Sequence, residues 1–178
     1  MTKILNFLSF WHAAGPAKWF AKDAVFDADL RAHFLDEHFA AARRAHEALL
    51  DDPEGALALI LLLDQVPRNV FRDSAHAYAA DPLAREYATR AIDAGFDLRV
   101  DPALRIFMYL PFEHSETLAD QDRTVALCEA LGDASYLKYA HAHRDVIRRF
   151  GRFPHRNRAL ARVNTAEEQT WLDAGGGF

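Results

Sequence analysis

The stretch PEGALALILLLDQVPRN, residues 53–69, decides the fold class of this chain. Its apolar core, Ala56–Leu63, covers every side of a helical repeat, and Asp52-Pro53 before it supplies an N-cap and a first helical residue. A helix that is apolar all round is one that other helices bury. The stretch therefore predicts a central buried helix over 53–68.

Helix punctuation continues along the chain in both directions. Asp81-Pro82 and Asp101-Pro102 each precede an apolar helical pattern, and Gly95, Gly132 and Gly151 stand where helices should stop. No segment alternates as a strand would. The expected helices cover about 2–11, 23–50, 53–68, 82–94, 102–110, 111–116, 119–131, 134–150 and 166–173. The pattern predicts an all-α chain, an array of antiparallel helical pairs.

Length and composition predict a single domain over residues 1–178. The chain has 178 residues, of which 51% are hydrophobic and 26% charged, as in ordinary globular domains. Asp133 is expected to cap a helix, and Thr165–Glu168 fits a capping box. The Gly-rich tail, 174–178, is expected to be frayed.

Composition also bounds the compartment and the partners. The one cysteine, Cys128, allows no internal disulfide, which suits a reducing compartment. The longest apolar run, Ala56–Leu63, is far below the ~20 residues of a membrane span, and the opening residues are weak as a signal peptide. A net charge of −5 argues against a nucleic-acid-binding face. We expect a cytoplasmic protein that binds no membrane.

Polar and aromatic side chains gather in three segments. These read DQVPRNVFR (64–72), YLPFEHSE (109–116) and RFGRFPHRN (149–157). The first and third are each expected to follow a helix, break at a proline and then present Arg-Asn, and the second also breaks at a proline. Side chains at such breaks can converge, so the three segments predict one polar pocket.

The arginines of these segments suit an anionic ligand. Guanidinium groups of Arg68, Arg152 and Arg156 would hold a carboxylate or phosphate, and the amides of Asn69 and Asn157 would orient it. The candidate ligand-binding residues are Asp64, Gln65, Arg68, Asn69, Arg72, Tyr109, Arg152, His155, Arg156 and Asn157.

A structural interpretation of the same arginines stays open. Buried charges usually come in pairs, so the arginines could bind Asp64, Glu113 or Glu116 and lock loops onto the core. Asp64 in particular opposes the dipole at its helix end, and Arg68 at i+4 is its nearest cation.

The second segment supplies the candidate catalytic residues. Glu113 and Glu116 share a helix face and could act as general acid and base, and His114 could do so near neutral pH. The alternative is an acidic first turn of a helix that begins at Pro111. These three residues lack a standard metal spacing, and the sequence has no P-loop, dinucleotide glycine motif or HExxH helix, so no metal or cofactor is assigned.

The same three segments resemble a known family. DQVPRNVFR, YLPFEHSE and HRDVIRRFGRFPHRN closely match hallmark segments of the bacterial domain-of-unknown-function family 924. The resemblance runs from the aromatic N-terminal segment, with Trp11, Trp19 and Phe20, to Asn157 and beyond. It implies a tetratricopeptide-like right-handed superhelix and supplies no activity.

Two functions follow as expectations. The first is a pocket that binds a small anionic molecule, with acid–base catalysis as a further step. The second is a tetratricopeptide-like module that binds a protein partner, with the arginine segments purely structural. The sequence decides neither whether the protein is an enzyme nor its oligomeric state.

Overall fold

The computed structural model describes residues 3–178 and divides the chain into two compact units. Unit 1 comprises residues up to 72 and residues 76–111, and unit 2 comprises residues 73–75 and 112–178. Within the described residues every regular element is a helix, so the all-α prediction is confirmed.

The elements follow the expected order with some changes of length. The α-helices are α1 (Lys3–Ala14), α2 (Pro16–Trp19), α3 (Ala24–Ala42), α4 (Pro53–Val70), α5 (Asp81–Asp93), α6 (Leu110–Glu113), α7 (Leu118–Leu131), α8 (Ala134–Phe150) and α9 (Ala166–Asp173). Short 3-10 helices are η1 (Glu47–Asp51), η2 (Ala75–Tyr78), η3 (Phe96–Leu98), η4 (Arg105–Met108) and η5 (Pro154–Arg156). The helix expected over 102–110 is thus only the 3-10 turn η4, and the one expected over 111–116 is the short α6.

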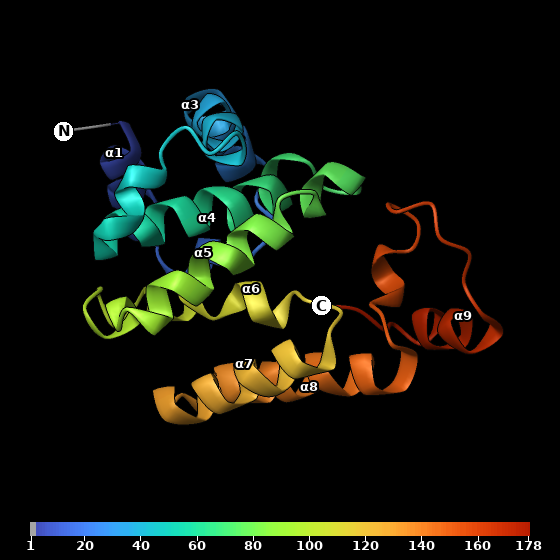
Figure 1. Cartoon of the computed structure of the whole chain (residues 1–178). Helices are drawn as coiled ribbons and strands as arrows, with labels where there is room; N and C mark the ends of the chain where they lie inside the picture. The colour runs from blue at the N-terminus through green and yellow to red at the C-terminus, as the bar shows by residue number, and fades with distance from the viewer. Residues whose placement is uncertain (1–2) are drawn as a thin grey trace. The chain divides into compact units, whose positions relative to one another are not determined.

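Helix α4 is the buried centre of unit 1, as predicted. From Ala56 to Leu63 no residue is more than 1% exposed. The side chain of Asp52 caps the helix by accepting a hydrogen bond from the N–H of Gly55 at 2.9 Å. α3 and α5 both pack against α4 (Figure 1). The apolar stretch that predicted the fold is therefore covered by neighbouring helices within its own unit.

The C-terminal end of α4 differs from the prediction. Pro67 lies inside the helix, which continues to Val70 instead of breaking. A proline in a helix interior removes one backbone hydrogen bond, and the helix tolerates this here because the surrounding residues are held by packing and ion pairs. Arg68 and Asn69 are consequently helical residues and do not belong to a loop.

The helix expected over 23–50 is also shorter. α3 ends at Ala42, and Arg44 takes a left-handed φ of 63° before the chain enters η1. The Arg44 guanidinium donates to Glu47 at 2.6 Å and to Glu86 of α5 at 2.6 Å, which fixes the turn. The sequence contains no glycine or proline between 43 and 50 to signal this stop.

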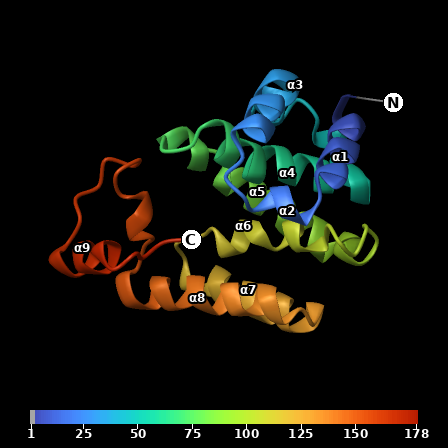
Figure 2. The ribbon, with the colours of Figure 1, turned by 180° about the vertical axis from the view of Figure 1, so that it is seen from behind.

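Aromatic residues join the N-terminal helices of unit 1. The indole N–H of Trp19 in α2 donates to the carbonyl oxygen of Trp11 in α1 at 2.8 Å. Trp11 is fully buried and its ring packs edge-on to that of Phe107, with centroids 5.5 Å apart. α1 and α2 are seen from behind in Figure 2, where α1 lies against α4.

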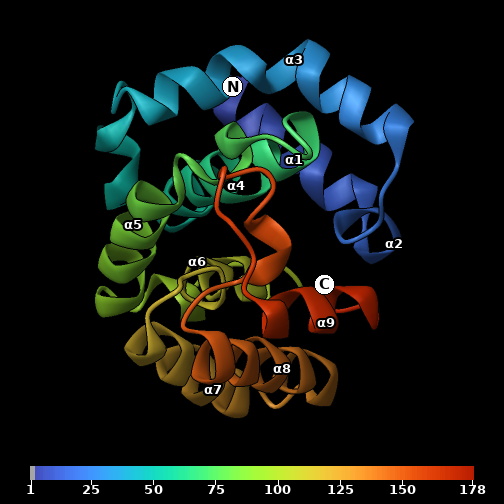
Figure 3. The ribbon, with the colours of Figure 1, turned by 90° about the vertical axis from the view of Figure 1, so that its right-hand side faces the viewer.

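Unit 2 is built on the pair α7 and α8. Gly132, with φ +79°, ends α7, and Asp133 caps α8 by accepting from the N–H groups of Ser135 and Tyr136. The two helices lie side by side (Figure 3). At the far end of α8, Phe150 packs against Trp171 of α9, with ring centroids 5.6 Å apart.

Candidate functional site

The two units divide the predicted site residues. Segment 64–72 and Tyr109 belong to unit 1, whereas Glu113–Glu116 and segment 149–157 belong to unit 2.

In unit 1 the polar end of α4 forms a closed set of ion pairs. Arg68 donates two hydrogen bonds to the carboxylate of Asp81, both at 2.8 Å, and its Nη1 lies 3.1 Å from Asp64 Oδ1. Gln65 donates to Asp64 at 2.7 Å. The expected Asp64–Arg68 pair is confirmed. Burial opposes the charge of Arg68, but Asp64 and Asp81 outweigh it and hold the pKa of Arg68 above its usual value.

The other candidate ligand-binding residues of unit 1 also form hydrogen bonds or ion pairs with neighbouring side chains. Arg72 donates to both carboxylate oxygens of Asp27, at 2.6 and 2.9 Å, and to the side-chain oxygen of Asn69 at 2.9 Å. The Tyr109 hydroxyl donates to Asp97 at 2.7 Å. These contacts favour a structural role for this end of α4.

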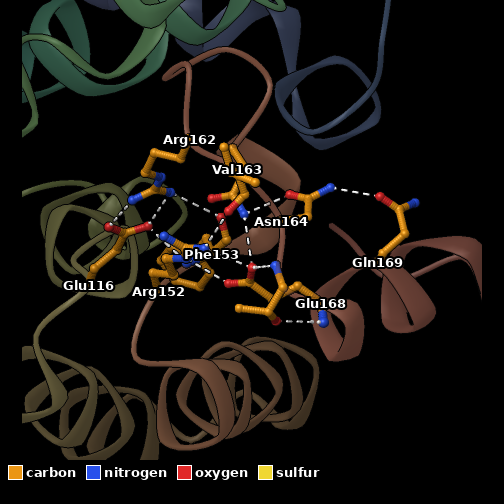
Figure 4. A network of polar contacts seen from close by, with 10 residues as sticks. Glu116, Arg152, Phe153, Arg162, Val163, Asn164, Glu168 and Gln169 are labelled. Atoms are coloured by element: carbon orange, nitrogen blue, oxygen red, sulfur yellow. Dashed lines mark hydrogen bonds and ion pairs between the residues drawn. The ribbon is translucent and has the colours of Figure 1, made fainter.

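In unit 2 two arginine–glutamate pairs join the loop after α8 to its neighbours. Arg152 donates to both carboxylate oxygens of Glu168, at 2.6 and 2.7 Å, and Arg162 donates to both of Glu116, at 2.7 and 2.9 Å. The backbone N–H of Phe153 adds a third hydrogen bond to Glu116 at 2.8 Å. We call Glu116, Arg152, Arg162 and Glu168 the arginine clasp (Figure 4).

Both carboxylates of the arginine clasp are held ionised. The hydrogen bonds from Arg152 lower the pKa of Glu168 to about 2. Burial alone would raise the pKa of Glu116, but the hydrogen bonds from Arg162 and from Phe153 N–H outweigh it and leave that pKa below its ordinary value. A carboxylate in this environment stays deprotonated and only accepts hydrogen bonds. This favours a structural role for Glu116 over the role of a general acid.

Asparagine side chains extend the arginine clasp toward α9. Asn157 is 1% exposed and donates to Asn164 at 2.8 Å and to Glu168 at 3.4 Å. Thr165 and Glu168 form the predicted capping box, which is therefore confirmed. Figure 4 shows Asn164 continuing the network to Gln169. The Oδ1 atom of Asn157 is buried and has no hydrogen-bond partner among the described residues.

A second polar group in unit 2 contains two histidines. The Nδ1 atom of His143, in α8, contacts the carbonyl oxygen of Tyr139 at 2.9 Å and lies 3.5 Å from Glu113 Oε1. His155 and Arg156 follow Pro154 in η5. We call His143, His155, Glu113 and Arg156 the histidine cluster.

Arg156 links the histidine cluster to the second segment. Its Nη1 donates to the carbonyl oxygen of His114 at 2.9 Å, and its guanidinium lies over the ring of Phe153, 4.3 Å from the ring centre. Arg156 is only 6% exposed. Segments 112–116 and 149–157 are thus joined through this residue and through Glu116.

Both histidines of the cluster are held neutral. Burial lowers the pKa of His143 to about 3. Burial, reinforced by the positive charge of Arg156, lowers the pKa of His155 to about 4. The Nδ1 atom of His155 is buried and has no hydrogen-bond partner within residues 3–178. The cluster therefore combines a buried cation with an imidazole nitrogen that has unused hydrogen-bonding capacity.

Sequence reasoning missed several of these partners. Arg152 pairs with Glu168 of α9, not with Asp64, Glu113 or Glu116, and Glu116 takes its cation from Arg162. The capping box identified Glu168 as a residue of the first helical turn, where its Oε2 accepts from the N–H of Thr165. The sequence did not indicate that Oε1 of the same carboxylate accepts a hydrogen bond from Arg152. His143 lies two residues from His141 on a predicted helix, and this spacing does not reveal what packs against either side chain.

Neither a metal-binding group nor a membrane-spanning helix is found among the described residues. Within residues 3–178 no group of three or more His, Cys, Asp and Glu side chains is arranged to hold a metal ion. Across those same residues the helices are all too short or too polar to cross a membrane.

Comparisons with known proteins cover the part of the chain that contains the three polar segments. A family model described as "Bacterial protein of unknown function (DUF924)" matches residues 7–176. No curated protein matches the chain. Among solved structures the chain is similar to the protein of unknown function ATU0120 from Agrobacterium tumefaciens, with 51% sequence identity over 97% of each chain and a TM-score of 0.94. The chain therefore belongs to the bacterial family of unknown function DUF924.

Proposed function

We propose that this protein binds a small anionic molecule at the histidine cluster of unit 2, and that the arginine clasp, whose guanidinium groups are occupied by carboxylates, takes no direct part in binding. The observation that carries the proposal is the buried Nδ1 of His155, which has no hydrogen-bond partner among the described residues and adjoins the buried guanidinium of Arg156. Buried polar atoms in native proteins are nearly always satisfied, and an exception calls for a reason such as a ligand.

Electrostatics supports an anion over a cation as the ligand. With both histidines neutral, Arg156 is a cation beside the unsatisfied nitrogen, and its lowering of the pKa of His155 is larger than the opposite effect of Glu116. An anion bound there would accept a hydrogen bond from the imidazole and favour its protonated form. Binding would then be coupled to proton uptake and would tighten as the pH falls toward the pKa of His155.

Fewer residues are expected to touch the ligand than the sequence alone predicted. Arg68, Arg72 and Arg152 each direct two hydrogen bonds at one carboxylate, so their capacity for a ligand is small. Glu116 is a poor candidate for acid–base chemistry on a bound molecule, because its two oxygens already accept three hydrogen bonds.

Isothermal titration calorimetry with acetate and with inorganic phosphate tests the proposal. The wild type is compared with His155→Phe, which keeps an aromatic ring and removes both ring nitrogens, and with Arg152→Gln as the control in the arginine clasp. We expect one of the two anions to bind the wild type and Arg152→Gln with similar affinity and to bind His155→Phe about ten-fold or more weakly.

Two results would contradict the proposal. One is that neither anion binds the wild type between pH 5 and neutral pH, where about one in ten of the His155 side chains or fewer is charged. The other is equal binding to the wild type and to folded His155→Phe, which would place the anion elsewhere.

A partner-binding module is the second candidate function. α8 exposes Tyr139, which is 54% exposed, and the loop before α9 exposes Val163, which is 86% exposed. The paired helices α7 and α8 are compatible with the tetratricopeptide-like arrangement, which stays a prediction together with the single domain and the cytoplasmic location. Recovery of a stoichiometric protein partner that the double variant Tyr139→Ala/Val163→Ala fails to bind would favour this candidate.

A further inference from the structure

Three aromatic rings of unit 2 form a seat around Phe178. The rings of Phe178 and His143 are stacked, with centroids 3.6 Å apart and an angle of 12° between their planes. Phe153 and His155 approach the same ring edge-on, at 6.2 and 5.7 Å and at angles of 89° and 84°. We call His143, Phe153 and His155 the aromatic seat, which presents one flat face and two walls.

The tail that carries Phe178 follows a path that requires glycine. A Cβ atom at Gly176 would overlap the indole ring of Trp171, and Gly177 has φ +148°. Only glycine adopts such a path without strain. The tail was expected to be frayed, yet its residues are shaped to bring the Phe178 ring onto the aromatic seat.

The contact between Phe178 and the aromatic seat can open at a small cost in free energy. Phe178 remains 54% exposed, whereas His143 beneath it is 7% exposed. Leaving the seat would therefore expose little additional surface of Phe178, and three successive glycines from Gly175 give the tail the backbone freedom to move. The larger change would fall on the seat, whose flat face would lose its cover.

The polar atoms at the aromatic seat define what could replace Phe178. His155, one wall of the seat, carries the buried Nδ1 that has no hydrogen-bond partner in the described part of the chain. Arg156 lies over the ring of Phe153, the other wall. A ligand with a flat ring and an attached carboxylate would place each part against a matching group.

We infer that the aromatic seat is a subsite for the flat ring of an aromatic carboxylate, and that Phe178 fills it as a displaceable plug when no such ligand is bound. The inference rests on the proposed function for the anionic group of the ligand and adds the aromatic ring and the plug. A ring that competes with Phe178 gains the stacked contact with His143 that Phe178 gives up.

The test uses two carboxylates that differ in the ring alone. Benzoate is flat and aromatic, and cyclohexanecarboxylate carries the same charge on a puckered aliphatic ring. Calorimetric affinities are measured for the wild type, for Phe178→Ala, and for Gly176→Ala, which displaces the tail and keeps the phenyl group. Phe20→Ala is the matched control, because Phe20 is 56% exposed and stacks on Phe107 in unit 1.

We expect Phe178→Ala and Gly176→Ala to bind benzoate about ten-fold more tightly than the wild type, which is the order expected of one stacked aromatic contact. Cyclohexanecarboxylate should show no such gain, and Phe20→Ala should behave as the wild type. In NMR spectra of Phe178→Ala, benzoate should shift the imidazole signals of His143.

Equal affinity of benzoate for the wild type and Phe178→Ala would overturn the inference, as would an equal gain for cyclohexanecarboxylate. Acetate separates this failure from failure of the proposed function. If acetate binds the wild type through His155 and benzoate gains nothing, the anion site stands and the aromatic subsite falls. If acetate fails and benzoate still binds the variants with shifts at His143, the subsite stands and the anion site falls.

Discussion

Two Arg-Asn pairs that look alike in the sequence have different surroundings in the two units. Arg68-Asn69 follows Pro67 and stays inside α4, where Arg68 is held by Asp64 and Asp81. Arg156-Asn157 follows Pro154 by one residue more and lies in and after the short helix η5, where its neighbours are His143 and His155.

The difference lies in how completely the polar atoms are satisfied. Around Arg68 each carboxylate meets a guanidinium or amide donor at 3.1 Å or less. Around Arg156 two buried atoms have no hydrogen-bond partner among the described residues, namely Nδ1 of His155 in the histidine cluster and Oδ1 of the adjacent Asn157. A fully satisfied network holds a fold together, whereas a partly satisfied one is where a ligand has something to contribute.

The largest effect is expected at Arg68. Arg68→Ala would leave the buried carboxylates of Asp64 and Asp81 without their shared cation and should lower the free energy of unfolding by about 3–5 kcal/mol. Urea denaturation followed by circular dichroism measures the change. A loss of less than about 1 kcal/mol would mean that the network is not what holds this end of α4.

An intermediate effect is expected at His143 as a function of pH. Its pKa falls from 6.5 to about 3 on folding, so the unfolded chain binds more protons between these values. Stability is therefore full above pH 6.5 and declines as the pH falls toward about 3. His143→Phe, which keeps a ring against Phe178, should reduce this slope by about 1.4 kcal/mol per pH unit.

The matched control for that prediction is His33→Phe. His33 is exposed on α3, and we expect the reduced slope to be confined to His143→Phe. Thermal unfolding followed across the pH range gives both profiles, and identical profiles for His143→Phe and the wild type would contradict the burial argument.

The smallest effect is expected in the arginine clasp. Glu168→Gln keeps the size of the side chain and removes the charge that faces Arg152, and it should lower the melting temperature less than Arg68→Ala does. The pKa of Glu168 is lowered from 4.5 to about 2, so its contribution is present above pH 4.5 and is lost as the pH falls toward 2. The melting curves of variant and wild type should therefore converge in acid.

Glu167→Gln is the control for the arginine clasp. Glu167 pairs with Arg149 at 2.8 Å, but their side chains are 61% and 51% exposed, and exposed ion pairs add little stability. A larger loss in Glu167→Gln than in Glu168→Gln would reverse the assignment of the structural pair.

Local signals predicted the parts of this fold that depend on neighbouring residues. The apolar run of α4, the Asp52 and Asp133 caps and the capping box at Thr165 all follow from contacts within one or two turns. The end of α3 did not, because Arg44 turns the chain through contacts with Glu47 and Glu86 that a helical pattern does not encode.

The candidate site was predictable in composition and less so in pairing. Segments 109–116 and 149–157 were expected to meet, and Glu116 and Arg156 do join residues 112–116 to segment 149–157 in unit 2. The partner of Arg152 and the placement of Phe178 on His143 depend on how α9 and the glycine tail pack, and no spacing in the sequence reports that.

The measurement that tests the central claim most directly is an NMR pH titration of the His155 imidazole with and without acetate or phosphate. We predict a pKa of about 4 in the absence of an anion, because of burial and Arg156, and a higher pKa in its presence. Titration at the ordinary value of 6.5 without an anion, or a pKa that neither anion changes, would contradict the assignment of the histidine cluster as the binding site.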